Sequence, residues 1–364
     1  MRDVSFKASV ATNLSGLGLP AKKLWDLVGR EKTENEYHLK YTPQDLRTAH
    51  YRFAGVDEEE QHQRLHSLFE VNNHQNPKLI VTRMTKGGVG KTSCSVNIAV
   101  SMAMAGLKVL FIDADPQASA TNMLGVDSNF QTDIVHIGTF LTKKPIGADH
   151  ELPKSIIPIF SGGFLDLIPA DITMSATDAQ MVSLMASHER AMSFLSRNSR
   201  WLSQNYDVII VDSAPGTTPI GLAFTYAAKI SGKILAIVEP EGTCLRALDS
   251  LESNINEINE FTHAGIGIEI VINKFHSQLK HIKECMGVLL TQYSTKLNEN
   301  MIPQYSGFSR QMDPANRATG PLVLQDSNSV GAKAIFGLTK SLIKSFGITL
   351  PGIPPEKMIV EKST

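Results

Sequence analysis

The sequence predicts an α/β protein in which helices cover both faces of a mostly parallel sheet, preceded by a small α-helical N-terminal domain. Three observations support this prediction. From residue 77 onward, short β-branched runs alternate with longer segments of helical period. A glycine-rich loop directly follows the first of these runs. Before residue 77 the chain is polar and contains only helix-like patches, which predicts a different architecture for the two parts.

The predicted strands are short apolar runs that lack a polar side. Strands that are buried on both faces of a sheet have this composition. Because helical segments separate the runs, consecutive strands can lie parallel through crossover connections. The five runs are Lys78–Thr82, Lys108–Ile112, Asp207–Val211, Lys233–Val238 and Ile266–Ile272.

Helical periodicity is found between and after these runs. The segments are Ser93–Ala105, Thr177–Ser196, Leu245–Glu260 and, last, Ala332–Phe346. We therefore expect one α/β domain over residues 77–350. The residues from Pro351 to the end form a proline-rich tail, 351–364, in which proline excludes a long helix. We expect this tail not to pack as regular structure.

Residues 1–76 are predicted to form the helical N-terminal domain and its linker. The helix-like patches are Ala21–Arg30 and Pro43–Phe53, and Thr42 with Pro43 forms a typical helix start. An acidic run, Asp57–Glu60, follows. The Asn- and Pro-containing stretch Val71–Pro77 is typical of a linker.

Composition excludes several classes of protein. The formal net charge is −1, so any contact with nucleic acid must come from a local basic patch rather than the whole surface. The three cysteines form no Cys-x-x-Cys pair, which favours a reducing compartment over a disulfide framework. The first residues lack the apolar core of a signal peptide, and no apolar run approaches the ~20 residues that cross a bilayer. We expect a cytoplasmic protein with no membrane partner.

The main chemical motif is the phosphate loop that follows the first predicted strand. It comprises Lys86, Gly87, Gly88, Val89, Gly90, Lys91 and Thr92, with Ser93 in the helix that begins there. Glycines let backbone N–H groups surround phosphate oxygens, and the helix N-terminus adds partial positive charge. Lys91 would bind the β- and γ-phosphates, and the Thr92 hydroxyl would bind Mg²⁺. The motif predicts ATP and Mg²⁺ as cofactors.

The loop resembles the deviant Walker A motif of the ParA/MinD family, because Lys86 precedes the glycines where an ordinary P-loop has none. The resemblance implies that Lys86 reaches a phosphate held by a partner subunit, so that ATP drives homodimer formation. Two strand ends extend the resemblance to residues 78–346. Asp113-Ala114-Asp115-Pro116-Gln117 resembles switch I, in which Asp115 would orient the attacking water and Asp113 would lie near Mg²⁺. Asp212 opens a Walker B-like element and would hold Mg²⁺ through water.

Asn273 ends a later strand at the place where the family reads adenine. An amide can accept a hydrogen bond from the adenine amino group and donate one to a ring nitrogen, which favours ATP over GTP. Asn is also a common turn residue after a strand, so this alternative stays open.

Among family members, the chain is most similar to the long form of the ParA partition ATPases, which carries an N-terminal helix-turn-helix domain. The resemblance implies non-specific, nucleoid-associated DNA binding by the ATP-bound dimer, operator DNA binding by the N-terminal domain, and stimulation of hydrolysis by a ParB-like centromere-binding protein. In the N-terminal domain, Arg47 would face DNA phosphates. In the ATPase domain the basic candidates are Lys274, Lys280, Lys283, Arg310 and Arg317.

Two other functions compete with DNA segregation. One is a positioning ATPase of the same fold that moves a protein cargo. The other is a metabolic ligase or phosphotransferase with a small-molecule acceptor. For the basic residues, a solvated helix face is the alternative to a DNA contact.

Overall fold

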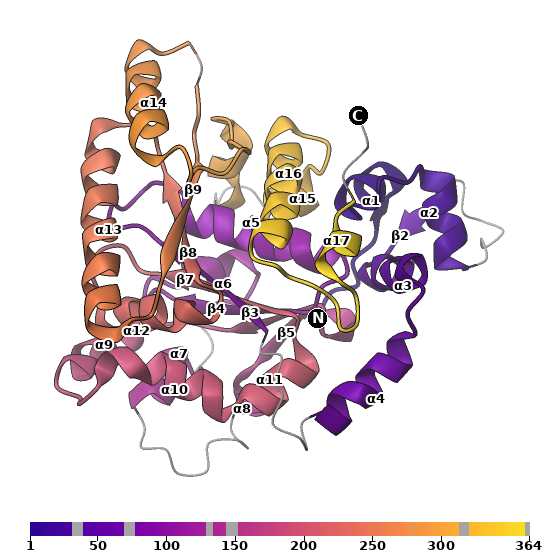
Figure 1. Cartoon of the computed structure of the whole chain (residues 1–364), viewed down its shortest axis with the longest axis horizontal. Helices are drawn as coiled ribbons and strands as arrows, with labels where there is room; N and C mark the ends of the chain where they lie inside the picture. Colours follow the sequence, from indigo (N-terminus) through magenta and orange to yellow (C-terminus); the bar gives the residue numbers. More distant parts are fainter. Residues whose placement is uncertain are drawn as a thin grey trace.

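The computed structural model describes residues 1–30, 39–68, 77–128, 134–142, 152–276, 278–312 and 320–360, without the side chains of 65–68 and 312. Its centre is a seven-stranded sheet of order β5-β6-β4-β7-β3-β8-β9 (Figure 1). Every neighbouring pair is parallel except β5 and β6. The strands are β3 (Lys78–Arg83), β4 (Val109–Ala114), β5 (Ile157–Phe160), β6 (Leu165–Ile168), β7 (Val208–Ser213), β8 (Lys233–Val238) and β9 (Gly267–Ile272). The predicted fold class is therefore confirmed.

Alternate residues of the central strands pack into two different cores. In β3, for example, Ile80 belongs to one apolar cluster and Val81 to the other, and both are fully buried. Successive side chains of a strand point to opposite faces of the sheet. Because helices cover both faces, neighbouring residues are buried in different cores. The first core contains the helices α5 (Lys91–Met104), α15 (Leu322–Gln325) and α16 (Val330–Ser345), together with the N-terminal region.

The second core lies on the opposite face of the sheet. Its helices are α7 (Ile137–Thr142), α9 (Met174–Val182), α10 (Arg190–Arg197), α11 (Ser199–Asn205), α12 (Pro219–Ala227), α13 (Gly242–Thr262) and α14 (Lys280–Tyr293). The remaining short elements of the domain are α6 (Ser119–Met123), α8 (Leu152–Ser155), η3 (Ser161–Gly163), η4 (Ser187–Glu189), η5 (Ala228–Ile230) and η6 (Ser306–Met312).

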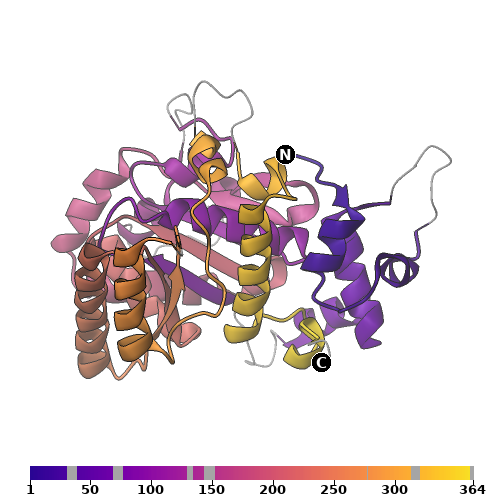
Figure 2. The same cartoon turned by 90° about the horizontal axis from the view of Figure 1, so that it is seen from above.

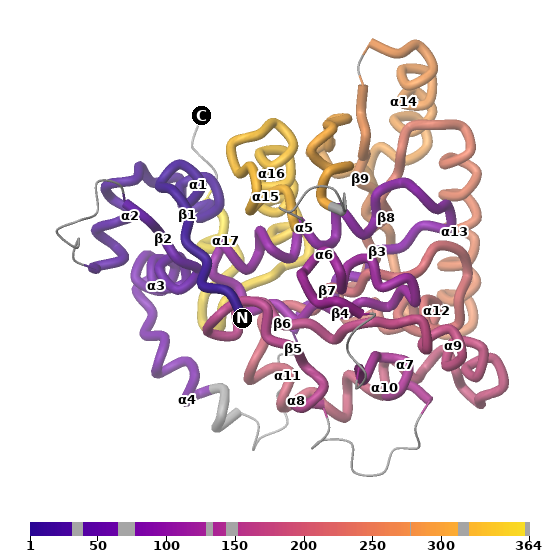
Figure 3. Tube along the Cα trace, turned by 180° about the vertical axis from the view of Figure 1, so that it is seen from behind, coloured from indigo at the N-terminus to yellow at the C-terminus, as the bar shows by residue number. Residues whose placement is uncertain are grey.

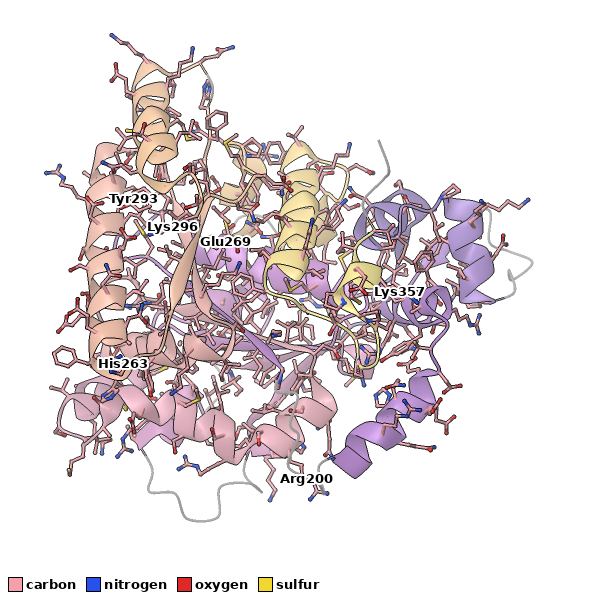
Figure 4. All side chains as sticks on the ribbon, in the orientation of Figure 1. Arg200, His263, Glu269, Tyr293, Lys296 and Lys357 are labelled. Atoms are coloured by element: carbon pink, nitrogen blue, oxygen red, sulfur yellow. The ribbon has the colours of Figure 1, made fainter. Side chains whose placement is uncertain are left out.

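Tyr293 and Lys296, labelled in Figure 4, hold the end of α14 against α13. The Tyr293 hydroxyl donates to Asp249 at 2.7 Å, and Lys296 pairs with Glu252.

One helix prediction in this domain needs correction, and one strand was not predicted. The expected helix Thr177–Ser196 is divided into α9, η4 and α10. The chain turns at Ala186, whose φ of 51° lies in the left-handed region that a continuous helix cannot contain. Strand β5 was not predicted, because it is a four-residue edge strand that contains Pro158 and a register shift.

In the N-terminal region, residues 1–30 and 39–68 form four helices and a two-stranded antiparallel ribbon. The elements are β1 (Phe6–Lys7), α1 (Ala8–Leu14), α2 (Ala21–Val28), β2 (Lys40–Tyr41), α3 (Pro43–Ala54) and α4 (Glu58–Leu68). The expected start of α3 is confirmed as a capping box, because the Thr42 hydroxyl accepts from Asp45 N and Asp45 accepts from Thr42 N. Viewed from above and from behind, this region lies at one end of the molecule beside α16 (Figures 2 and 3).

Helix α3 is buried on both sides, which contradicts the expectation that Arg47 faces DNA. The Arg47 side chain is 1% exposed. Its Nη1 donates to Asp207 Oδ2 at 2.7 Å and to the Gly106 carbonyl at 3.1 Å, and its Nε donates to Glu58 at 2.8 Å. A guanidinium enclosed by these acceptors cannot reach a phosphate. Arg47 therefore joins the N-terminal region to the ATPase domain.

The proline-rich tail also departs from expectation, because it packs. It contains the short helix α17 (Pro355–Met358), and Ile353 and Met358 are buried in the first core, which the N-terminal region shares with the ATPase domain. Lys357, labelled in Figure 4, donates to the Ala54 carbonyl at the end of α3. Proline excludes a long helix but is accepted in the first turn of a short one. Among the described residues, no helix combines the length and apolarity that crossing a membrane requires.

Candidate nucleotide site

The phosphate loop lies at the carboxyl edge of the sheet, between β3 and α5. Gly88 and Gly90 have φ angles of 78° and 87°, a conformation that favours glycine. A Cβ atom built on Gly87 or Gly88 would meet nothing within 4 Å, whereas one on Gly90 would lie 2.4 Å from the Asn273 amide nitrogen. The loop is thus open at Gly87 and Gly88, where a phosphate could approach the backbone, and closed at Gly90.

Lys91 is the first residue of α5 and is buried below the loop. Only 6% of the residue is exposed, and burial lowers the pKa of its ammonium group, although the nearby carboxylates Asp212 and Asp115 oppose this effect. An ammonium group that is desolvated and directed toward acidic residues is suited to bind an added anion. The structure therefore places Lys91 where the phosphate loop requires it.

Asp113 and Asp212 lie side by side at the ends of β4 and β7, where the register pairs them directly. Both are fully buried. Burial, and then the charge of Asp212, raises the pKa of Asp113 to about 7. Burial is also the main cause that raises the pKa of Asp212 to about 6. Two neighbouring carboxyl groups with raised pKa values are typical of a functional site, since this arrangement needs an added cation to hold both charges.

Asp212 fits a magnesium ion better than Asp113 does. Its Oδ1 accepts from the Ser95 hydroxyl at 2.9 Å, while its buried Oδ2 has no hydrogen-bond partner among the described residues. Both oxygens of Asp113 are used, because Oδ2 accepts from the Thr121 amide and hydroxyl and Oδ1 accepts from Asp115 N. The described residues contain no group of three His, Cys, Asp or Glu suited to a metal. Mg²⁺ at phosphates commonly has only one or two protein ligands, so Asp212 and Thr92 suffice.

Asp115 lies next to Asp113 on the loop that follows β4. Its Oδ1 accepts from Gln117 N at 3.0 Å, and the residue is 8% exposed. The loop then turns through Ala118, whose φ is 53°. The structure brings Asp115 to the same sheet edge as Lys91, which is the condition for a role near the transferred phosphate.

Lys86 lies at the rim of the loop and is held by α13. Its Nζ donates to Glu241 Oε2 at 2.7 Å and to the Thr243 hydroxyl at 2.8 Å, and the bond to Glu241 raises the pKa of Lys86. The side chain is 29% exposed. Lys86 therefore has an acceptor within its own chain. Glu241 was not predicted as a site residue. In the sequence it lies between a predicted strand and a predicted helix, and this position could have indicated it.

Two residues at the end of β9 contact the phosphate loop. The Asn273 amide donates to the Val89 carbonyl at 2.8 Å. Lys274 Nζ donates to the Gly88 carbonyl at 2.8 Å and to Glu239 at 2.9 Å. Lys274, expected among the DNA-contacting residues, is thus engaged at the nucleotide site. The hydrogen bond from Asn273 holds the phosphate loop in place, and this role does not depend on contact with an adenine base.

The other expected DNA-contacting residues lie away from the loop or outside the described residues. Lys280 and Lys283 are exposed on α14, where Lys280 approaches Glu284 one turn later. Arg310 is exposed in η6. Arg317 falls outside the described residues. The predicted basic set is therefore distributed over separate elements.

Arg83, at the end of β3, is a buried cation that the sequence analysis missed. It is 1% exposed, and its Nη2 donates to the Gly216 carbonyl at 3.2 Å in the loop after β7. Burial lowers its pKa to about 10, although Asp178 opposes this effect. Gly221 makes room for the guanidinium, since a Cβ there would lie 2.0 Å from Arg83 Nη1. Arg83 thus supports the loop that follows Asp212.

The comparison with protein families agrees with this site. A family model described as an AAA domain matches residues 77–268, just over half of the chain and the part that contains the phosphate loop, Asp113, Asp115 and Asp212. The chain belongs to this family, of ParA/MinD-type ATPases. The matched range begins where β3 begins and ends in β9.

Curated relatives resemble most of the chain at low identity. The sporulation initiation inhibitor protein Soj of Bacillus subtilis is 26% identical over 266 residues, 73% of this chain and 98% of Soj. The cell division protein PomZ of Myxococcus xanthus is 28% identical over 261 residues, 71% of this chain and 75% of PomZ. The chromosome partitioning protein ParA of the same organism is 23% identical, covering 73% of this chain and 88% of that protein. The chain therefore resembles, over most of its length, proteins named for sporulation control, cell division and chromosome partitioning.

Solved structures confirm the fold and extend it to metabolic enzymes. Cobyrinic acid a,c-diamide synthase from Mycobacterium smegmatis, with a bound ATP analogue and magnesium, has a TM-score of 0.60 and 18% identity, and covers 76% of this chain and 98% of that chain. At this identity the likeness concerns the fold. The fold alone therefore does not distinguish a partition ATPase from an amide-forming enzyme.

Proposed function

We propose that this protein is an ATP-dependent DNA-segregation ATPase, whose ATP-bound dimer binds DNA without sequence preference. The observation that carries the proposal is Lys86, a cation that directly precedes the open glycines of the phosphate loop and lies 2.7 Å from Glu241 at the rim. A lysine that enters from outside the glycines can bind a phosphate of a second subunit. Bound ATP would then decide whether two subunits associate.

Within one subunit, each residue has a separate role. Lys91 binds the β- and γ-phosphates and stabilises the charge that develops on the transferred group. Asp115 orients the attacking water, and Ser93 closes the loop at the start of α5. Thr92 and Asp212 would hold Mg²⁺, which would neutralise phosphate charge. Asp113 keeps Thr121 and the Asp115 backbone in place.

DNA binding by the dimer is proposed for Arg310, Lys280 and Lys283, with Arg317 as a further candidate. Lys280 and Lys283 are exposed on α14, and Arg310 is exposed on η6. Phosphate contacts by such side chains weaken steeply as salt is raised, because bound counterions are released. A ParB-like centromere-binding protein would stimulate hydrolysis.

Operator binding by the N-terminal region is a separate part of the proposal. Because α3 and Arg47 are buried, it would depend on exposed residues such as Lys22 and Lys23 of α2. Protection of DNA near the gene's own promoter tests it. A variant with Lys22→Ala and Lys23→Ala should lose that protection and keep ATP-dependent binding to arbitrary DNA.

The central experiment is a filter or gel assay with an arbitrary duplex. We expect binding with ATP and Mg²⁺ at about 50 mM salt, little binding with ADP, and a loss of roughly 10³-fold or more in affinity at about 200 mM salt if six or more phosphates are contacted. Absence of ATP-dependent binding at low salt would refute the proposal. Lys91→Ala serves as the nucleotide-free control.

Two other functions have distinct signatures. The first is a positioning ATPase of the same fold that acts on a protein cargo, which should bind no operator. The likeness to cobyrinic acid a,c-diamide synthase keeps open a ligase with a small-molecule acceptor. Fast ATP consumption that depends on such an acceptor would favour the ligase, whereas slow basal hydrolysis favours a switch.

A further inference from the structure

Gln311, at the end of η6, is a fully buried amide whose hydrogen-bonding positions are all used. Its Nε2 donates to the Ser93 hydroxyl at 2.6 Å and to the Phe308 carbonyl at 3.0 Å. Its Oε1 accepts from Asn97 Nδ2 at 2.6 Å and from Leu322 N at 2.9 Å. The residue is 0% exposed. A buried amide with four partners fixes the relative position of everything that it contacts.

Two of these partners belong to the helix of the phosphate loop. Ser93 directly follows Thr92, and Asn97 lies one turn further along α5. The Asn97 amide donates to the Ser93 carbonyl at 2.7 Å, and its Oδ1 accepts from Val323 N at 3.1 Å. The first turns of α5 are thus connected to η6 and α15 through side-chain amides.

On its other side, Gln311 holds the segment that carries a candidate DNA-contacting residue. Arg310 precedes it and is exposed. The Gln311 backbone carbonyl accepts from Gly320 N at 3.2 Å, so the residue also contacts the chain just before α15. One side chain therefore lies between the start of the phosphate-loop helix and the η6 surface.

We propose, on the basis of the proposed function, that Gln311 is a positioning residue that couples the nucleotide at the phosphate loop to DNA binding by η6. The Ser93 hydroxyl accepts from Gln311 and keeps its own proton, which it can donate to a phosphate oxygen above the loop. The hydroxyl then bridges the nucleotide and Gln311 and is held in one rotamer. Gln311 in turn fixes η6 and the orientation of Arg310. Among the described residues, the Ser93 hydroxyl is linked to η6 directly by this bond to Gln311, and Asn97 adds a path from the Ser93 carbonyl to the same amide.

The test compares Gln311→Leu with wild type by three measurements. The first is nucleotide affinity, measured with a fluorescent ATP analogue. The second is the ratio of duplex-DNA affinity with a non-hydrolysable ATP analogue to that with ADP. The third is hydrogen exchange over residues 304–325 with and without Mg²⁺ and the analogue. We expect nucleotide affinity to change less than about threefold, the DNA-affinity ratio to fall at least about tenfold, and the nucleotide-dependent protection to disappear.

Two further variants make the test specific. Gln304→Leu introduces the same chemical change at an exposed glutamine of the same segment and should behave as wild type. Ser93→Ala removes only the bridging hydroxyl, and its effect on the DNA-affinity ratio should not add to that of Gln311→Leu. If Gln311→Leu fails to fold, Ser93→Ala alone should still lower the ratio and the protection.

The outcomes separate the two proposals. If wild type shows nucleotide-dependent DNA binding but Gln311→Leu retains the full ratio, the role of Gln311 is refuted and the segregation function stands. Additive effects of the two substitutions also refute it. If wild type binds no DNA with nucleotide, the proposed function is refuted. Absence of nucleotide-dependent protection over 304–325 in wild type refutes the coupling by itself.

Discussion

Arg47 of α3 and Asp207, which precedes β7, form a buried ion pair in which Nη1 lies 2.7 Å from Oδ2. Asp207 also accepts from Lys108 N at 2.7 Å, just before β4. The N-terminal region is thus fixed at the amino edge of the sheet, opposite the phosphate loop. Gly106 permits this contact, because a Cβ there would lie 2.5 Å from the Arg47 backbone nitrogen.

The first prediction concerns this pair. Arg47→Met should lower the free energy of unfolding by about 3–5 kcal/mol, because it leaves the Asp207 carboxylate buried without its cation. Urea unfolding of the full chain measures the loss. Arg64→Met, which removes an exposed partner of Glu60, is the matched control and should cost about 0.3–0.5 kcal/mol. Equal effects of the two substitutions would contradict the assignment of Arg47 as the main junction.

The second prediction concerns the contact between Lys86 and Glu241. In the proposed dimer, Glu241 would compete with the partner's phosphate for Lys86, so Glu241→Gln should lower the ATP concentration needed for dimerisation. The pair is partly exposed, so the expected change is about two- to fivefold. Sedimentation with a non-hydrolysable analogue measures it. Lys86→Ala should abolish dimerisation while some nucleotide affinity remains, and a Lys86→Ala variant that still dimerises with ATP would exclude the role of Lys86.

The third prediction concerns Lys91. Lys91→Ala should reduce nucleotide affinity about 100-fold, since it removes charge-assisted hydrogen bonds to the phosphates together worth about 3 kcal/mol. A fluorescent ATP analogue measures the affinity. Thermal unfolding of the nucleotide-free protein is the control, because it shows whether the variant is still folded at the temperature of the binding measurement. Nucleotide affinity that stays close to wild type would mean that Lys91 does not bind phosphate.

The fourth prediction is a pH dependence of stability that arises from His50. This side chain is buried on α3, and burial, with the charge of Arg47, lowers its pKa to about 4. Between pH 6.5 and about 4 the unfolded chain therefore binds a proton that the folded chain does not, so stability falls as the pH falls through this range. The loss from this group is roughly 3 kcal/mol at most. Urea unfolding at pH 6.5 and 4.5 measures it.

His50→Leu provides the control for that dependence. The substitution removes the proton-binding group and should flatten the fall in stability between the two pH values. The nucleotide-free full-length chain is the proper sample, because bound ligand adds its own pH dependence. A variant with the same slope as wild type would assign the slope to other groups.

The sequence by itself determined the parallel sheet, the phosphate loop and its acidic neighbours. These features depend on local patterns: apolar runs buried on both faces, glycines with open backbone, and carboxylates at strand ends, which parallel strands bring to one edge. The start of α3 at Thr42 was predictable for the same reason, since a capping box lies within four residues.

Only the tertiary structure decided what the cations do. Arg47, Lys274 and Arg83 are ordinary basic residues in the sequence, and their acceptors lie far away in the chain, at Asp207, Glu239 and Gly216. Gln311 carries no motif, yet it contacts Ser93 of the phosphate-loop helix. A charged or amide side chain is exposed or buried according to what packs around it, and sequence patterns of short range do not contain that information.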